Sequence, residues 1–177
     1  MKKLSMEELD RLSVNEFRQA DKLKVVVVLD NIRSQHNIGS IFRTADAFRI
    51  ECIHLCGITA TPPNREIQKT ALGATESVEW KYYEKTCNSI EELKKEGYRI
   101  IAIEQADESI KINDFNPCIS SKIAIVFGNE VFGVDDEVMQ ICDECIEIPQ
   151  YGTKHSLNVS VTAGIVIWNI FNKLTVK

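Results

Sequence analysis

The sequence lacks an excess of basic residues, since 26 aspartates and glutamates outnumber 21 lysines and arginines and give a formal net charge of −5. A protein coated with positive charge for indiscriminate nucleic-acid binding is therefore excluded, whereas a local basic rim on an acidic body is not. The sequence also lacks internal repeats, low-complexity tracts and a clear domain boundary. The segment Thr61-Pro62-Pro63-Asn64 indicates a loop rather than a linker.

No charged and then apolar leader follows Met1, so we expect no secretory signal. The most apolar late stretch, Val159 to Phe171, is too short to span a membrane, and it contains Ser160, Thr162 and Asn169. These two absences predict a cytoplasmic protein that has no membrane partner.

The cysteines lack the arrangement of a disulfide framework or a metal site. In a chain of this size without a signal, reduced thiols are expected at all six positions, Cys52, Cys56, Cys87, Cys118, Cys142 and Cys145. Cys142 and Cys145 form a C-x-x-C pair, but no second pair with ligand spacing accompanies them and no histidine follows until His155. We expect thiols packed near a strand and no bound metal.

Length and composition are those of one soluble domain, because 177 residues can bury a core and 44% hydrophobic residues is an ordinary value. Val25 to Leu29 is a continuous apolar run, typical of a strand covered on both faces. Further strands are predicted at Ile50 to Leu55, Val78 to Tyr82, Arg99 to Glu104, Lys122 to Phe127 and Cys145 to Ile148. Helices alternate with them, at Ser40 to Phe48, Ser89 to Glu96, Asp135 to Cys142 and about Leu157 to Lys173. This alternation predicts an α/β fold with a mostly parallel sheet flanked by helices.

The two ends of the chain have contrasting patterns. Residues 1–24 are predicted to form a polar helical extension before a domain over residues 25–177, with a sparse apolar stripe at Leu4, Leu9, Leu12 and Phe17. The last helix is apolar nearly all round and must be buried. The pattern leaves open whether one subunit buries it or a second subunit covers part of it.

Three segments of unusual polar content each follow a predicted strand, where ligands gather in open α/β sheets. In the first, Asn31 to Ser40, either Asn37 or Ser40 can cap the following helix, and Gly39 lets the backbone approach a ligand. Free amides at the helix start attract phosphate, and Arg43 lies close to that end. An ordinary capped helix with a solvated arginine explains the segment equally well.

The other two segments differ in how much they indicate. In the second segment, Phe127 to Gly133, two glycines bracket a polar pair. The segment has neither P-loop nor dinucleotide-binding spacing, so two interpretations stay open, a phosphate cradle and an ordinary turn. In the third segment, Ile148 to Ser160, the residues Ser156-Leu157-Asn158 open a very apolar helix. Capping explains Ser156 but not Asn158, a poor helix former in the first turn, which favours a functional role.

Together the segments resemble the three ordered motifs of the SpoU (TrmH-like) RNA 2′-O-ribose methyltransferases, within the SPOUT superfamily. The resemblance runs from about Val25 to the C-terminus and rests on Asn37-Ile38-Gly39-Ser40-Ile41-Phe42-Arg43-Thr44-Ala45, Ile125 to Val134, and Ile148-Pro149 with Ser156-Leu157-Asn158-Val159-Ser160. Thr70-Ala71-Leu72-Gly73-Ala74 is similar to an internal segment of that family. The resemblance implies a SPOUT fold with a C-terminal trefoil knot and a homodimer.

The resemblance also implies a cofactor and its site. S-adenosylmethionine would bind in the knotted loops, at Glu104, Gly128, Ile148, Ser156 and Leu157. The reaction site would contain Asn37, Arg43, Glu130, Ser156 and Asn158. Arg33, His36, Arg43, Lys69, Lys154 and His155 are candidates for a basic rim that holds RNA, although each taken singly also suits a solvated surface residue.

The implied chemistry is displacement at the sulfonium methyl group by a ribose oxygen, which needs a base or a strong orienting contact. The family's usual proposal makes Arg43 that base. A guanidinium is normally never deprotonated in proteins, so Arg43 is equally a group that holds a phosphate and stabilises developing alkoxide charge. Glu130 and Asn158 are interpreted as positioning groups, and Ser156 as a loop-fixing or substrate contact.

The partner expected is RNA, with tRNA favoured over rRNA because only residues 1–24 precede the catalytic domain. Two other hypotheses compete with an enzyme. One is an RNA-binding protein that kept the fold and lost methyl transfer, against which the intact motifs count. The other is a generic nucleotide-binding α/β protein, against which the missing P-loop and dinucleotide patterns count.

Overall fold

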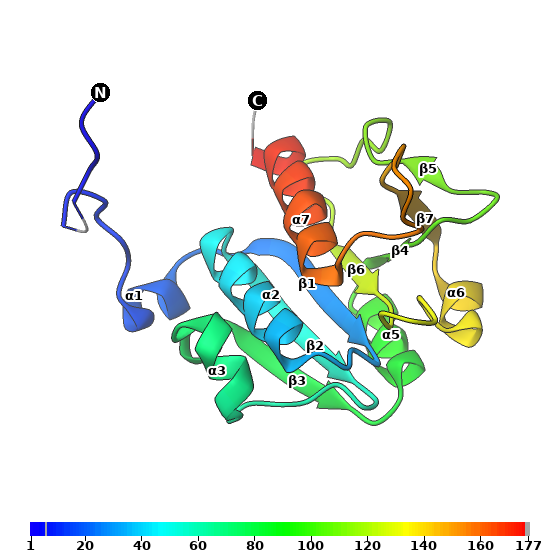
Figure 1. The fold of residues 1–177 in the computed structure, drawn as a ribbon, viewed down its shortest axis with the longest axis horizontal. Helices are drawn as coiled ribbons and strands as arrows, with labels where there is room; N and C mark the ends of the chain where they lie inside the picture. Colours follow the sequence, from blue (N-terminus) through cyan, green and yellow to red (C-terminus); the bar gives the residue numbers. More distant parts are fainter. Residues whose placement is uncertain (6, 176–177) are drawn as a thin grey trace.

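The computed structural model describes residues 1–5 and 7–175. They form a seven-stranded parallel sheet with helices on both faces (Figure 1). The strands are β1 (Leu23–Asp30), β2 (Ile50–Cys56), β3 (Glu79–Tyr83), β4 (Arg99–Ile103), β5 (Ile110–Lys111), β6 (Ile123–Phe127) and β7 (Glu144–Glu147). The helices are α1 (Val14–Gln19), α2 (Gln35–Ala47), α3 (Arg65–Ala71), α4 (Ala74–Ser77), α5 (Thr86–Lys95), α6 (Asp136–Ile141) and α7 (Val159–Thr175). The predicted fold class is confirmed.

The sheet separates two apolar layers because side chains alternate along each strand. Along β1, Val25, Val27 and Leu29 pack on the side of α2, α3 and α7. Val26 and Val28 pack on the other side, with residues of α5 and α6. The continuous apolar run of β1 therefore reflects burial on both faces, as predicted.

The strand order, β3-β2-β1-β6-β4-β7-β5, places β6 between β1 and β4. The loops that follow β1, β4, β6 and β7 consequently meet at the carboxyl edge of the sheet. From β7 the chain returns through residues 148–158 to α7, which packs against α2 (Figure 1). The trefoil knot implied by the family resemblance stays a prediction.

Several predicted boundaries are wrong. The helical extension shrinks to Val14–Gln19, where Ser13 and Glu16 form a reciprocal cap, while Leu4, Leu9 and Leu12 are exposed. Helix α2 begins at Gln35 rather than Ser40, and α7 begins at Val159 rather than Leu157. The sequence analysis missed α3, α4 and the two-residue strand β5 because they are short or polar.

Helix α7 is covered only in part by its own chain. Ala163, Val166, Ile167, Ile170 and Leu174 are buried, but Val161, Ile165 and Trp168 remain 51%, 39% and 52% exposed. Burial of the whole helix within one subunit is therefore wrong. None of the helices in the described part of the chain is long and apolar enough to cross a membrane.

All six cysteines are free thiols. Burial raises the pKa of Cys52, Cys56 and Cys142 to about 12. In the C-x-x-C pair, Cys142 donates to the Val138 carbonyl and Cys145 donates to the Glu104 carbonyl. The prediction of packed thiols near strands is confirmed for these positions, whereas Cys118 is exposed.

Candidate active site

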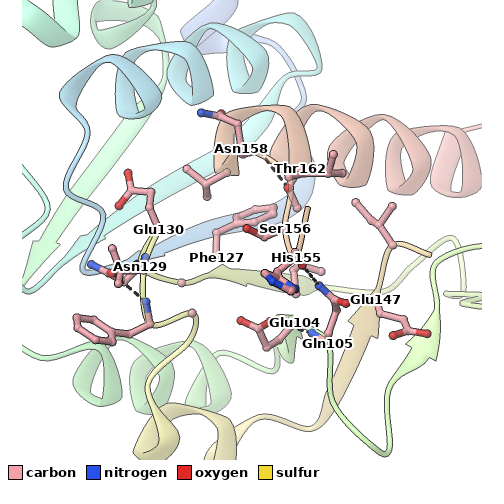
Figure 2. Close-up of a pocket in the computed structure, with 18 of the residues that line it drawn as sticks. Glu104, Gln105, Phe127, Asn129, Glu130, Glu147, His155, Ser156, Asn158 and Thr162 are labelled. Carbon is pink, nitrogen blue, oxygen red and sulfur yellow. Dashed lines mark hydrogen bonds between the residues drawn. The ribbon is translucent and has the colours of Figure 1, made fainter. Parts of the chain in front are cut away.

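A cavity of about 520 Å³ opens at the carboxyl ends of β4, β6 and β7, beside the start of α7 (Figure 2). It brings together eight of the predicted site residues, Glu104, Gly128, Glu130, Ile148, His155, Ser156, Leu157 and Asn158. Those residues come from three separate loops, so the fold gathers the second and third motifs into one site. We call this the carboxyl-edge pocket.

The loop after β6 closes on itself in a tight turn. Asn129 and Gly133 exchange two backbone hydrogen bonds of 2.8 Å, and the Asn129 side chain accepts from the amides of Val131 and Phe132. A Cβ at Gly128 would lie only 2.0 Å from the Val134 nitrogen, so glycine is required by the turn itself. Of the two interpretations left open for this segment, the ordinary turn describes its backbone.

Glu130 connects this turn to the loop that precedes α2. Its carboxylate accepts hydrogen bonds from the backbone amides of Arg33 at 2.9 Å and Ser34 at 3.0 Å. It also accepts from the Asn37 side-chain amide at 3.1 Å. Burial is the largest single influence and favours the neutral acid, but hydrogen bonds from the backbone amides of Arg33, Ser34 and Glu130 and from the Asn37 side chain together outweigh it and lower the pKa of Glu130. Glu130 is therefore an ionised group that fixes the first motif against the second.

The structure corrects three expectations for the first motif. Ser34 caps α2 by accepting from the Asn37 amide at 3.3 Å, so neither Asn37 nor Ser40 is the cap. The backbone amides that lead into the helix donate hydrogen bonds to the Glu130 carboxylate, and not to a phosphate. Arg43 lies nine positions after Ser34, about 13 Å along the axis, and not near the helix start.

Asn158 joins the third motif to the same network. Its Oδ1 accepts from the Ser160 amide at 2.9 Å and from the Ser160 hydroxyl at 2.6 Å, so it caps α7. Its side-chain NH₂ donates to Asn37 Oδ1 at 3.1 Å. The predicted position of Asn158 inside the helix, without a capping role, is wrong. An unbroken chain of hydrogen bonds now runs from Glu130 through Asn37 to Asn158.

Further contacts fix the walls of the carboxyl-edge pocket. Glu104 accepts from the Gln105 amide at 2.8 Å and from the Val134 amide at 3.4 Å, which joins the loops after β4 and β6. Gln105 donates to the His155 carbonyl at 2.8 Å and holds the loop before α7. These lining residues were not foreseen: Gln105, Phe127, Asn129, Phe132, Gln150, Val159 and Thr162. Only a strand-end position marks Gln105 in the sequence.

Arg43 lines a different hollow, a groove of about 500 Å³ between α2 and α3. We call it the α2–α3 groove; it is lined by Ser40, Arg43, Thr44, Ala47, Phe48, Lys69 and Thr70. It shares no lining residue with the carboxyl-edge pocket. Within one chain the structure therefore does not bring Arg43 together with the other predicted catalytic residues.

Gly39 has another role than the one expected. It is buried in α2, and a Cβ there would lie 2.1 Å from Thr70 Oγ1 and 2.2 Å from the Ile67 carbonyl oxygen. The glycine permits close packing of α2 on α3 and does not face a ligand. The predicted ligand approach at Gly39 is wrong.

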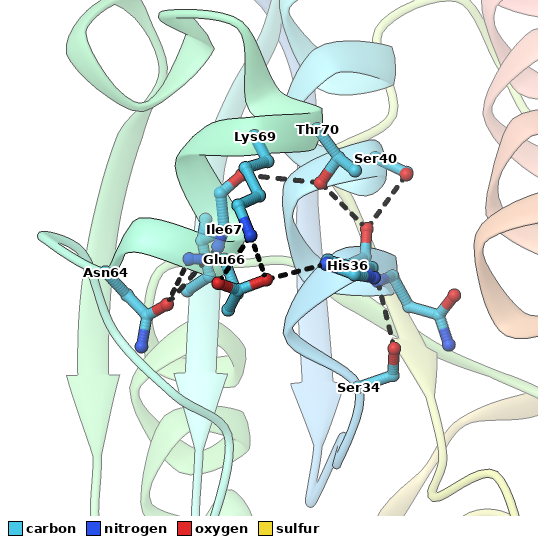
Figure 3. A network of polar contacts seen from close by, with 9 residues as sticks. Ser34, His36, Ser40, Asn64, Glu66, Ile67, Lys69 and Thr70 are labelled. Carbon is cyan, nitrogen blue, oxygen red and sulfur yellow. Dashed lines mark hydrogen bonds and ion pairs between the residues drawn. The ribbon is translucent and has the colours of Figure 1, made fainter.

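The predicted basic rim divides between the two hollows. Lys154 and His155 are exposed in the loop before α7, and Arg33 is exposed beside Glu130. Lys69 lines the α2–α3 groove, His36 lies one turn before the groove residue Ser40 on α2, and both contact Glu66 (Figure 3). The structure thus places basic side chains at the mouths of both hollows.

Comparison with known proteins identifies the class. The model of the SpoU rRNA methylase family matches residues 24–168, and the chain belongs to this family. It is 34% identical over 159 residues to the tRNA (guanosine(18)-2′-O)-methyltransferase of Aquifex aeolicus, an alignment covering 88% of this chain and 71% of that protein. It is 33% identical to the 23S rRNA (guanosine-2′-O-)-methyltransferase of Neisseria meningitidis, covering 81% of this chain and 56% of that protein.

A solved structure gives the same result. The AdoMet-bound rRNA methyltransferase of Sinorhizobium meliloti matches with a TM-score of 0.80 and 26% identity, over 91% of this chain and 61% of that one. The chain spans about three fifths of the length of most curated relatives it matches.

Proposed function

We propose that this protein transfers a methyl group from S-adenosylmethionine to a ribose 2′-hydroxyl of RNA. Family membership and the names of the relatives support the reaction. The observation that carries the proposal is the hydrogen-bond chain from Glu130 through Asn37 to Asn158 beside the carboxyl-edge pocket. It unites one residue of each motif at the edge of the sheet where α/β proteins bind ligands.

The carboxyl-edge pocket suits S-adenosylmethionine. Its volume of about 520 Å³ lies within the range of small-molecule sites, and Ile148, Leu157 and Val159 offer an apolar surface to an adenine ring. Glu104 and Glu147 offer carboxylates to an ammonium group. When bound, the cofactor supplies an electrophilic methyl group on a sulfonium.

The chain's own side chains have distinct roles in this reaction. Glu130, Asn37 and Asn158 hold the three motif loops in fixed relation, and Ser156 contacts the cofactor or fixes its loop. As the ribose oxygen bonds to the methyl group, the hydroxyl proton would pass to solvent water and the bond from the methyl carbon to sulfur would break. Arg43 remains a guanidinium that holds a phosphate and stabilises the developing charge on that oxygen, since its deprotonation is unfavourable.

The substrate we favour is tRNA, with rRNA as the alternative. The relative from Aquifex aeolicus, named for a tRNA guanosine, aligns over a larger share of its length than the relative named for 23S rRNA. The protein would work in the cytoplasm, where either RNA is found.

The active form we propose is a homodimer. The exposed stripe of Val161, Ile165 and Trp168 on α7 is apolar and needs cover. Phe48 packs on Trp168 with ring centroids 5.5 Å apart, and it also lines the α2–α3 groove. A second copy that packs on this stripe therefore reaches the groove that contains Arg43. We infer that the active site is shared between the two subunits.

The dimer predicts the mass in solution. Sedimentation equilibrium at micromolar concentration should give about twice the 20.1 kDa of one chain. A catalytically active species that sediments as a single chain would contradict the dimer and the shared site together.

Cofactor binding gives a direct test of the carboxyl-edge pocket. Leu157→Ala should weaken binding of S-adenosylmethionine about tenfold. The substitution removes buried apolar contact, and the lost free energy of about 1.4 kcal/mol corresponds to a tenfold rise in the dissociation constant. Isothermal titration calorimetry measures the change. Leu72→Ala, which alters an exposed leucine at the C-cap of α3 that does not line the pocket, is the matched control and should bind as the native protein does. Equal affinities in the two variants would remove Leu157 from the site.

Methyl transfer distinguishes an enzyme from an RNA-binding protein that has lost catalysis. Labelled S-adenosylmethionine is incubated with separate tRNA and rRNA fractions, and the products are digested to nucleosides. We expect 2′-O-methylated nucleosides from the tRNA fraction. Cofactor and RNA binding without transfer to either fraction would favour the non-catalytic alternative.

A further inference from the structure

Glu66 lies between two basic side chains, His36 of α2 and Lys69 of α3, and Lys69 also lines the α2–α3 groove (Figure 3). Its carboxylate lies 3.0 Å from His36 Nε2 and 2.7 Å from Lys69 Nζ. Hydrogen bonds from Lys69 and then from His36 lower the pKa of Glu66, so the group is a carboxylate at neutral pH. One anion thus bridges two basic side chains from different helices.

The same face of α2 continues from His36 toward Arg43. Residues 36, 40, 43 and 47 lie one turn apart on one side of the helix, so His36 and Arg43 line one stripe. Lys69 belongs to the wall of the groove that contains Arg43. In residues 1–5 and 7–175, Arg43 has no carboxylate partner within ion-pairing distance.

Hydrogen bonds and close packing join the two helices that form the groove. Thr70 donates to the His36 carbonyl at 3.0 Å, and Ser40 donates to the same carbonyl at 2.9 Å. The absent Cβ of Gly39 lets the two helices approach closely. Asn64 caps α3 by accepting from the amides of Glu66 and Ile67. These contacts hold together the backbone that carries His36, Glu66 and Lys69.

The bridging contacts themselves are easily exchanged. The side chains of His36, Glu66 and Lys69 are 60%, 39% and 53% exposed. Ion pairs this exposed contribute little to stability, so another anion can replace the carboxylate at small cost. A phosphodiester carries two charged oxygens, as a carboxylate does, and can therefore bridge the same two donors.

We propose that the α2–α3 groove is a phosphate subsite for the RNA backbone, and that Glu66 takes the place of this phosphate in the free protein. His36 and Lys69 hold this phosphate beside the groove, next to the phosphate and ribose that Arg43 contacts. Glu66 lowers RNA affinity in two ways, because it engages both basic side chains and repels the incoming phosphate. This inference rests on the proposed function, since it assigns the way that RNA enters the same site.

The direct test compares RNA binding by the native protein and by Glu66→Gln. Unfractionated tRNA is titrated by fluorescence anisotropy between 50 and 200 mM KCl. The variant should bind up to about fivefold more tightly, the exchange that one exposed ion pair permits. The dependence of log affinity on log salt should steepen by about one, because a further cation becomes available to phosphate. Unchanged or weaker binding by Glu66→Gln would overturn the inference.

Two further variants separate a local effect from a change of net charge. Glu92→Gln alters the charge equally, but Glu92 pairs with Lys81 on the other face of the sheet, so its tRNA affinity should stay native. In a Lys69→Gln background, Glu66→Gln should gain much less than in the native protein. An equal gain from Glu92→Gln, or an undiminished gain beside Lys69→Gln, would overturn the phosphate subsite.

Parallel measurements on the native protein keep the two proposals distinct. Methyl transfer to tRNA by the native protein with no gain from Glu66→Gln would remove only the role of Glu66. Failure of the native protein to bind S-adenosylmethionine and to methylate RNA would remove the proposed function, and the inference with it.

Discussion

Arg43→Ala should lower the single-turnover rate of methyl transfer by about 10²- to 10³-fold, the usual effect of losing one charged contact to a transition state. Arg43 is exposed in the α2–α3 groove and does not line the carboxyl-edge pocket. Binding of S-adenosylmethionine should therefore stay close to native. Rapid-quench methylation of tRNA, beside separate titrations of cofactor and RNA, separates rate from affinity.

The conservative variant decides what the guanidinium does. Arg43→Lys keeps the positive charge but loses the planar fork that binds phosphate and oxygen together, so it should restore only part of the rate. If Arg43→Ala reduced only RNA affinity and left the rate at saturating RNA unchanged, Arg43 would be a binding group alone. Arg18→Ala is a suitable control, because Arg18 lies in α1, donates to the Glu76 carbonyl and lines neither hollow.

The sequence predicted the strands well because burial on both faces leaves an unmistakable apolar run. Val25 to Leu29 lies within β1, and Lys122 to Phe127 contains the whole of β6. Strand β5 has only two residues, and both are exposed, so no pattern marks it. Helices α3 and α4 are short, and their polar residues resemble a loop.

Helix starts were harder to predict than strands because several residues in each motif are able to cap. Ser34, Asn37 and Ser40 all have suitable side chains, and only the path of the chain selects Ser34. The same ambiguity concealed the role of Asn158 as the cap of α7. The same side-chain oxygen makes such a residue suitable both as a helix cap and as a functional group, so the sequence does not distinguish the two roles.

The residue types and the family resemblance predicted which residues belong to the candidate site, but not how these residues are arranged. Nothing in the spacing shows that Glu130 binds the backbone before α2, since 96 positions separate it from Ser34. Nothing in it shows that Arg43 lies apart from Glu130 in one chain either. Both facts depend on β6 inserting between β1 and β4, which is a long-range property of the sheet.

A second large effect on methyl transfer is expected because Arg43 and the carboxyl-edge pocket lie in separate hollows of one chain. Ile165→Glu places a charge in the exposed apolar stripe of α7, where Ile165 is 39% exposed in the single chain. Burying that charge against a second copy is costly, whereas leaving it in water is not, so the variant should fold as a monomer. If each active site needs Arg43 from one chain and the carboxyl-edge pocket from another, methyl transfer should fall by about 10²-fold or more, as for Arg43 removal itself.

The comparison is made at matched concentration by sedimentation, circular dichroism and methylation of tRNA. Ile119→Glu introduces the same charge at an exposed isoleucine before β6, and it should remain dimeric and active. Mixing Ile165→Glu with Arg43→Ala should not restore activity, because the Ile165→Glu chain cannot dock on a second chain and the Arg43→Ala dimers lack the guanidinium. A folded Ile165→Glu monomer with native turnover would show that one chain brings Arg43 to the cofactor without help, and the shared active site would have to be abandoned.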